Sequence, residues 1–151
     1  MTPRRGRKPP LIQISNNHHG IRVRENEIEK LVKHVLSAEK IPVREIHIIL
    51  AEDEYLHGLH KEYLNNDTPT DVMSFNLSDD DHVEGEIYIS LDRAKSQAVR
   101  FNVSFDSEIA RLIIHGLLHL KGYDDSTAPE RKEMRTKEDY YLDKYLRIIL
   151  L

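Results

Sequence analysis

The sequence predicts an α+β domain in which helices pack on a mixed four-stranded β-sheet. Three observations favour this class: strand and helix patterns alternate in the order β-α-β-α-β-β-α-α-α, no internal repeat is found, and no linker-like stretch divides the chain. The 151 residues suit one domain, since chains of this size bury roughly 68–70% of the surface they expose when unfolded. We therefore expect a single domain over residues 11–151, preceded by a flexible basic arm over residues 1–10.

The composition alone excludes several kinds of site and argues against some classes of function. The chain has no cysteine, which excludes disulfides and thiolate zinc sites, so His, Asp or Glu would have to hold any metal ion. The formal net charge of −4 argues against strong nucleic-acid binding, although the cations of residues 1–10 could contact phosphate or serve solubility alone. No apolar run approaches the roughly 20 residues of a membrane helix, and no signal-peptide pattern is found. We expect a soluble cytoplasmic protein with no membrane partner.

The first half of the chain alternates strands and helices. Residues 11–15 are apolar and residues 45–51 are rich in β-branched side chains, so we expect both to be strands. Between them, apolar residues recur at helical spacing over residues 28–36. A second helix is expected after Glu52, because acidic residues in a first turn suit the helix dipole. Residues 71–76 form the next expected strand.

The second half begins with one more strand and continues with helices. A strand over residues 86–90 could form a hairpin with the preceding one across the acidic loop 78–84, which we interpret as a solvated tip. Two helices are expected over residues 91–101 and 106–121. A last, charged helix over residues 127–149 starts with a capping box and an early proline.

The strongest chemical signal is the segment SEIARLIIHGLLHLKGYDD. Its apolar positions follow helical spacing, and it places His115 and His119 four residues apart on one face, where two imidazoles can share a cation. We expect Gly122 to end this helix in a left-handed turn that brings Asp124 and Asp125 back beside the histidines. The spacing is that of a catalytic site with three protein ligands, which leaves the fourth position of a tetrahedral zinc ion open to water.

Other interpretations of these residues remain open. Two structural histidines are the alternative to a metal site, although burying both without partners would cost on the order of a few kcal/mol. Gly116 stands where H-E-x-x-H peptidases have their general base, so another carboxylate, substrate phosphate or the metal alone would have to deprotonate water. Asp124 is the nearest spare carboxylate and a candidate catalytic residue; its other roles are to accept a histidine N–H or to cap the turn. Arg111, one turn before His115, is a candidate phosphate contact, with a salt bridge to Glu108 as the alternative.

Three blocks of the sequence point to one known family. HGLLHLKGYDD resembles the H-G-x-L-H-L-x-G-Y-D-H signature of the YbeY family of bacterial metal-dependent endoribonucleases. DTPTDVMSF over residues 67–75 looks like the second motif of this family. GEIYIS over residues 85–90, followed by Ala94 and Gln97-Ala98, is similar to its third block. The matches are in register across roughly residues 46–146, which is most of the chain.

The resemblance implies a compact α+β fold and one zinc ion, or another divalent transition metal, held by His115, His119 and Asp125. It implies cleavage of single-stranded RNA in maturation of the 3′ end of 16S rRNA and in late ribosome quality control. The small ribosomal subunit and its assembly factors are the implied partners. Ser74 and Thr70-Asp71 of the second motif are expected to line the cleft, or else to form hydrogen bonds of the turn and the strand start.

Two positions depart from the family pattern. The third ligand is usually histidine, whereas Asp125 is a harder ligand that makes the site one charge more negative. The family tends to carry arginine after the tyrosine of a Y-R-x-x-D segment, whereas Leu64 follows Tyr63 here, so a phosphate-clamping cation is missing from this position. Among the remaining histidines, His57 and His60 have the best ligand spacing, and we interpret them as surface residues of the second helix.

We therefore expect a metal-dependent endoribonuclease, with two other classes of function open. One is another zinc hydrolase, such as a peptidase, which Gly116 deprives of its usual base. The other is a non-catalytic ribosome-assembly factor with a structural metal, which Leu64 makes reasonable.

Overall fold

The structure is a computed structural model that describes residues 9–150, with side chains described as far as residue 147. Most of the expected basic arm, residues 1–8, lies outside the described residues. The elements are β1 (Leu11–Asn16), α1 (Glu25–Ala38), β2 (Val43–Ala51), α2 (Asp53–Leu64), β3 (Val72–Asn76), β4 (Val83–Ser90), α3 (Leu91–Phe101), α4 (Phe105–Lys121) and α5 (Ala128–Leu150). None of the helices in the described residues is both long enough and apolar enough to cross a membrane.

The four strands form one mixed sheet, as the sequence predicts, and their order is β1-β2-β4-β3. β1, β2 and β4 are parallel, and β3 pairs with β4 as an antiparallel hairpin in which Met73 lies opposite Tyr88. β4 begins earlier than expected, because Val83 and Gly85 are buried and continue its alternation into the acidic loop. The rest of this loop is an exposed tip, where Arg44 of β2 forms ion pairs with Asp80.

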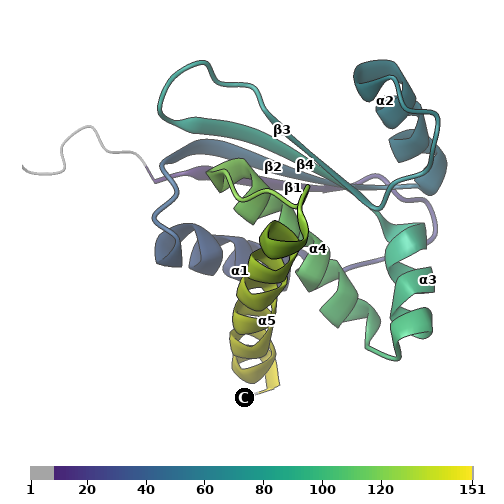
Figure 1. Ribbon diagram of the computed structural model, residues 1–151. Helices are drawn as coiled ribbons and strands as arrows, with labels where there is room; N and C mark the ends of the chain where they lie inside the picture. Colours follow the sequence, from purple (N-terminus) through teal and green to yellow (C-terminus); the bar gives the residue numbers. More distant parts are fainter. Residues whose placement is uncertain (1–8, 151) are drawn as a thin grey trace, which may run out of the picture.

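The helices cover the two faces of the sheet unequally (Figure 1). α1, α4 and α5 lie on one face, whereas α2 lies on the other face, at one end. α4 is the central helix, since it contacts α1, α3 and α5 as well as β3 and β4. Its apolar residues Ile113, Ile114, Leu117 and Leu118 are completely buried. The burial of these residues fixes the direction in which the histidines of α4 point.

Both ends of α4 are capped, and the cap at Gly122 is the one that the sequence predicts. Ser104 Oγ accepts a 3.0 Å hydrogen bond from the backbone N–H of Ser107. At the other end, Gly122 adopts φ +118°, a left-handed conformation that glycine reaches without a Cβ penalty. The N–H groups of Gly122 and Tyr123 bond to the carbonyls of His119 and Leu118 at 3.0 and 3.1 Å. The chain therefore leaves α4 in a defined direction.

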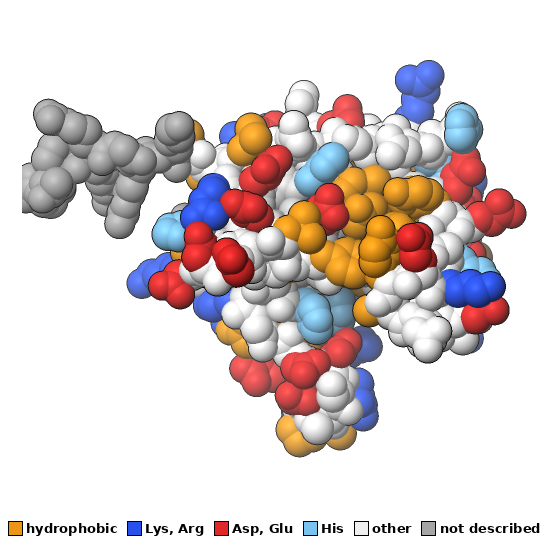
Figure 2. Space-filling view, turned by 90° about the horizontal axis from the view of Figure 1, so that it is seen from above, with side chains coloured by type: hydrophobic (Ala, Val, Ile, Leu, Met, Phe, Trp, Pro, Cys, Tyr) orange, Lys and Arg blue, Asp and Glu red, His pale blue; other side chains and the backbone are white. Residues whose placement is uncertain are grey.

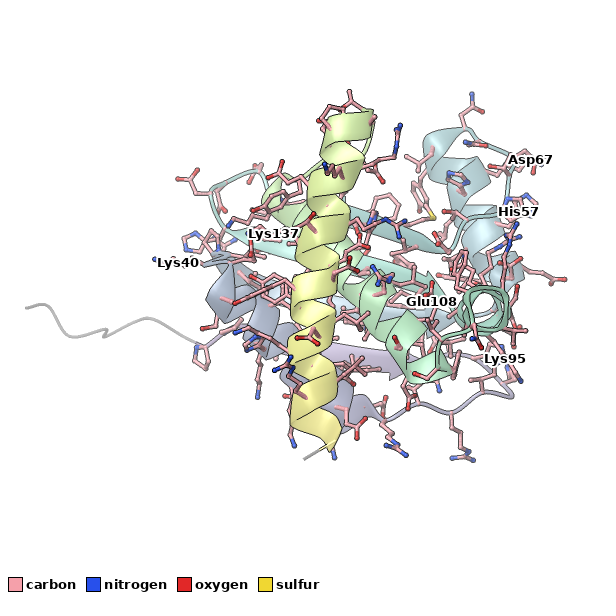
Figure 3. All side chains as sticks on the ribbon, turned by 60° about the horizontal axis from the view of Figure 1, so that its bottom comes forward. Lys40, His57, Asp67, Lys95, Glu108 and Lys137 are labelled. Carbon is pink, nitrogen blue, oxygen red and sulfur yellow. The ribbon has the colours of Figure 1, made fainter. Side chains whose placement is uncertain are left out.

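A buried carboxylate holds the loop after α4 in place. Glu39, just past α1, accepts hydrogen bonds from Lys121 (3.1 Å), Tyr123 (3.2 Å), Lys137 (3.2 Å) and Tyr141. Figure 3 shows Lys137 on the side of α5 that faces the end of α1, marked by Lys40. Burial alone would raise the pKa of Glu39, but the hydrogen bonds outweigh it and lower the pKa to about 2. One ionised carboxylate thus joins the end of α1 to the end of α4 and to α5.

Candidate functional site

The structure places the three predicted metal ligands around one cavity. The rings of His115 and His119 are parallel within 4°, with centroids 6.5 Å apart. Asp125 follows in the loop after Gly122, and its Oδ2 lies 3.5 Å from His115 Nε2. All three side chains line one cavity of about 310 Å³, which we call the histidine cavity. It lies against β3, an edge strand of the sheet.

A carboxylate that the sequence analysis did not single out orients His115. Glu138, on α5, is buried, and its Oε2 lies 2.8 Å from His115 Nδ1. An ionised carboxylate can only accept a hydrogen bond, so the proton of His115 is on Nδ1. Nε2 then faces Asp125 with a free lone pair and could coordinate a metal ion. Burial would lower the pKa of His115, but the Glu138 carboxylate outweighs this effect and raises it.

The donor set fits a zinc ion in its chemistry, because two imidazole nitrogens and one carboxylate oxygen are common zinc ligands. Among the described residues, however, no three His, Asp or Glu side chains already converge closely enough to hold an ion. His119, near the end of α4, and Asp125, in the loop, are both exposed. Metal binding would therefore require these two side chains to turn toward His115, which is already held by Glu138.

Close packing explains why glycine follows His115. A Cβ atom at Gly116 would lie 2.8 Å from Cγ2 of Ile87 and 3.1 Å from Oγ of Ser74, so α4 packs directly on the sheet at this point. Ser74 Oγ also donates a 3.3 Å hydrogen bond to the Gly116 carbonyl. A glutamate, as in H-E-x-x-H peptidases, has no space at position 116.

Residues of the second motif, DTPTDVMSF over residues 67–75, line two neighbouring cavities. Ser74 and Thr70 line the histidine cavity, as expected. Asp71 instead lines a second cavity, and its side chain accepts a 3.2 Å hydrogen bond from Gln97. The alternative role of Asp71 at the strand start is also present, because its carbonyl accepts the N–H of Ser90 at 2.9 Å.

The second cavity, of about 380 Å³, lies against the other side of His115 and contains three arginines; we call it the arginine cavity. It shares His115 and Asp125 with the histidine cavity. Arg131 Nη1 donates to the carbonyls of Asp125 (3.3 Å) and Ser126 (3.2 Å), contacts that leave its charge uncancelled. Arg135 forms no ion pair with any side chain that the structure describes. These two guanidinium groups therefore have no carboxylate partner among the described side chains, although four carboxylates also line the cavity: Asp71, Glu108, Asp125 and Glu138.

Arg111, the third arginine of this cavity, lies on the histidine face as predicted but has other partners than expected. Its guanidinium contacts Glu138 at 3.1 Å and Asp139 at 2.8 Å, whereas the expected ion pair with Glu108 is not formed. Two carboxylates therefore compensate its charge. Glu108 is buried against the same cavity, and burial raises the pKa of its carboxyl although Arg111 opposes the shift.

Asp124 lies apart from the histidines. Its Oδ1 accepts the backbone N–H of Asp125 at 2.8 Å and the hydroxyl of Ser126 at 3.2 Å, so it caps the turn. It lines neither the histidine cavity nor the arginine cavity. Asp124 therefore has the capping role that the sequence analysis offered as an alternative. A catalytic role for Asp124 stays a prediction.

The histidine cavity also includes His60, which the sequence analysis placed on the open surface. His60 Nδ1 donates a 2.7 Å hydrogen bond to the Thr68 carbonyl, which leaves Nε2 without an assigned partner. His57 contacts Asp67 at 2.8 Å outside the two cavities (Figure 3). Leu64 lines the same cavity as His60, so the missing family arginine is a difference within the site. The sequence contained a signal for the position of His60. It lies one helical turn before Leu64, which occupies the position of the family arginine.

Comparison with known proteins identifies relatives that share one family name. A family profile described as Endoribonuclease YbeY matches residues 13–146. The Flavobacterium psychrophilum protein with that name is 43% identical over 108 residues, covering 72% of this chain and 77% of the relative. The Salinibacter ruber protein with the same name is 33% identical over 147 residues, covering 91% and 94%. The solution structure of TM1509 from Thermotoga maritima has a TM-score of 0.64 at 30% identity and covers 89% of each chain.

Proposed function

The chain belongs to the endoribonuclease YbeY family, and from this premise we propose that it is a metal-dependent endoribonuclease acting on single-stranded RNA. The observation that carries the proposal is the position of His115 between two cavities. One of them offers His115, His119 and Asp125 as metal ligands. The other offers Arg131 and Arg135 as cations for the RNA phosphates.

We propose zinc as the metal, held by His115, His119 and Asp125. When bound, such an ion supplies a Lewis acid that polarises a phosphoryl oxygen and activates water. The harder carboxylate ligand also suits other divalent transition metals, which we retain as alternatives.

The protein's own residues position the substrate and the ligands. Glu138 keeps the proton of His115 on Nδ1, so that Nε2 remains a ligand, and Arg111 supports Glu138 from its other oxygen. Arg131 and Arg135 bind phosphates, and Arg131 also fixes the loop that carries Asp125. Asp124 is retained as a candidate proton acceptor on this loop.

We extend the proposal to the biological substrate. The motif resemblance supports a role in maturation of the 3′ end of 16S rRNA and in late ribosome quality control in the cytoplasm. The small subunit and its assembly factors would then be the partners that present the RNA strand.

The test compares ligand variants with a matched histidine variant. We expect His115→Ala and His119→Ala to lose bound metal in elemental analysis and to lose cleavage of a labelled single-stranded oligoribonucleotide. The control His57→Ala removes a histidine outside both cavities and should retain metal and activity. Full cleavage by a metal-free double variant of His115 and His119 would rule the proposal out.

The same variants separate the two other classes of function. Release of peptides from casein by the wild type, absent in His115→Ala, would favour a zinc peptidase. Normal ribosome binding and normal rRNA processing with His115→Ala would favour an assembly factor with a structural metal.

A further inference from the structure

Four aromatic side chains form a continuous strip on the sheet face opposite α4. Tyr55 and Tyr63 come from α2, Phe75 from β3 and Tyr88 from β4. The ring centroids are 6.2 Å apart from Tyr55 to Tyr88, 5.9 Å from Tyr88 to Phe75, and 6.1 Å from Phe75 to Tyr63. Figure 2 shows hydrophobic side chains gathered on this face. We call these four residues the aromatic strip.

The aromatic strip is open to solvent although it consists of large rings. Tyr55 and Tyr63 are 51% and 63% exposed, and Phe75 and Tyr88 are partly exposed. Burial of four such rings would stabilise the fold, so their exposure on a sheet face that only α2 covers in part indicates a binding surface.

This surface is continuous with the histidine cavity. Phe75 belongs to the aromatic strip and also lines the cavity that contains His115 and His119. Tyr63 contacts Phe75 and is followed in the chain by Leu64, which lines the same cavity. A polymer bound at His115 can therefore reach the strip by passing over the edge strand β3, which carries Phe75.

The geometry suits the bases of a single strand. The ring planes differ by 78° between Phe75 and Tyr88 and by 66° between Phe75 and Tyr63, so bases that lie on successive rings cannot be stacked on one another. Aromatic side chains stack on any base, because every base has a π-face. Tyr88 donates a 3.0 Å hydrogen bond to Glu86, and this carboxylate disfavours phosphates near the strip. Phosphates can pair instead with Arg131 and Arg135 on the other side of His115, because these two guanidinium groups have no carboxylate partner among the described side chains.

We propose that the aromatic strip is a binding surface that stacks the bases of single-stranded RNA on one side of the cleavage site. The substrate class rests on the proposed function, whereas the orientation of the strand follows from the strip and the arginine cavity. Bases on one side of the cleaved bond then lie on Tyr63, Phe75, Tyr88 and Tyr55 in turn.

Binding measurements with the full chain test this surface. The probes are a fluorescein-labelled 2′-O-methyl oligouridylate and an abasic strand of the same length. We expect Tyr55→Leu and Tyr63→Leu each to weaken binding of the oligouridylate by about fivefold or more, and to leave the abasic strand unaffected. Tyr55→Phe retains the ring and should bind as the wild type does. Tyr140→Leu, which changes a 52% exposed tyrosine on α5, is the matched control and should also bind normally.

A fluorescent reporter gives a direct signal of stacking. The chain has no tryptophan, so Tyr55→Trp and Tyr140→Trp each introduce a single one. The oligouridylate should quench the emission of Tyr55→Trp and leave that of Tyr140→Trp unchanged. The abasic strand should quench neither variant.

The outcomes separate this inference from the proposed function. If the wild type cleaves RNA but the Leu variants bind like the wild type, the strip does not bind RNA while the endoribonuclease proposal stands. If the strip binds oligouridylate but no cleavage occurs, the inference stands and the proposed function fails. If the wild type forms a dimer that Tyr55→Lys dissociates without changing RNA binding, the strip is a contact between copies and the inference is overturned.

Discussion

Two buried glutamates, Glu39 beside α5 and Glu138 on α5, have different kinds of partner. Glu39 accepts four hydrogen bonds from two lysines and two tyrosines, and together with Lys137 and Tyr141 it lines a separate cavity of about 740 Å³. Glu138 accepts from Arg111 and from His115, and the far side of the His115 ring lies open to two cavities. Both carboxylates are almost fully buried, so burial alone does not distinguish a structural group from one that serves a site. The chemistry of the partners does, because Glu39 binds lysines and tyrosines whereas Glu138 binds an imidazole whose Nε2 faces Asp125.

The largest expected effect is on stability, at Glu39. Glu39→Ala removes the shared acceptor of Lys121, Lys137 and Tyr141, and breaking a buried pair of this kind costs about 3–5 kcal/mol. We expect the free energy of unfolding in urea to fall by this amount, while the activity of the folded fraction is retained. Glu133→Ala, an exposed carboxylate of α5, is the control and should change stability little. A stable Glu39→Ala protein without activity would reverse the assignment of the two glutamates.

The pH dependence of stability is a second test of the structural role of Glu39. The folded pKa of Glu39 is about 2, below its ordinary 4.5, so its ionised form stabilises the fold. This contribution is complete above about pH 5 and is lost as the pH falls through 4.5 toward 2; it amounts to about 3 kcal/mol. Unfolding measured at several pH values should show this loss in the wild type and a flatter curve in Glu39→Gln. Parallel curves for the two proteins would contradict the role of Glu39.

Glu138 is expected to act on the site, with a smaller effect on stability than Glu39. Glu138→Gln keeps the shape of the side chain but removes the charge that orients His115, and the loss of such a partner lowers metal affinity about 10–100-fold. Zinc competition with a chromophoric chelator measures this change. The urea midpoint of the metal-free variant should fall less than that of Glu39→Ala, because the glutamine keeps an acceptor oxygen and Asp139 still pairs with Arg111. Unchanged zinc affinity in Glu138→Gln would show that packing alone positions His115.

The smallest effect tests the packing beneath His115. Gly116→Ala forces a Cβ against Ile87, and overpacking of this kind costs about 1–3 kcal/mol. Gly58→Ala in α2 is the matched control, because nothing lies within 4 Å of its added Cβ. There the exchange should stabilise the helix by about 0.5–1 kcal/mol. Thermal unfolding of the two variants should therefore shift in opposite directions.

Local patterns were sufficient to predict most of the fold. The capping residue Ser104 was not singled out, but the left-handed turn at Gly122 and the hairpin of β3 and β4 were expected from their own residues. The start of β4 was wrong by three residues, because Glu84 and the aspartates before it obscured the burial of Val83. Acidic residues on the outward face of a strand produce the same composition as a loop.

The site was predictable where its residues are close in sequence. His115, His119 and Asp125 lie within a single helix and turn, and the structure places them in one cavity. Glu138 was missed because it reaches His115 from another helix, 23 residues later. A signal was available, since Glu138 lies four residues after buried Met134 and so falls on the apolar face of α5. A carboxylate on an apolar helical face requires a partner, and the search for that partner leads to His115.

The acidic tip between β3 and β4 has a consequence for how copies of the protein behave in concentrated solution. β3 is an edge strand, and unpaired edges are templates for strand addition and aggregation. Here the edge is only Val72–Asn76, and it is followed at once by the exposed Asp79 and Asp81. Two β3 edges that paired in parallel would bring these like charges together, so the tip disfavours that pairing. The open strand edge beside the cavity is therefore protected against the in-register parallel addition of further copies.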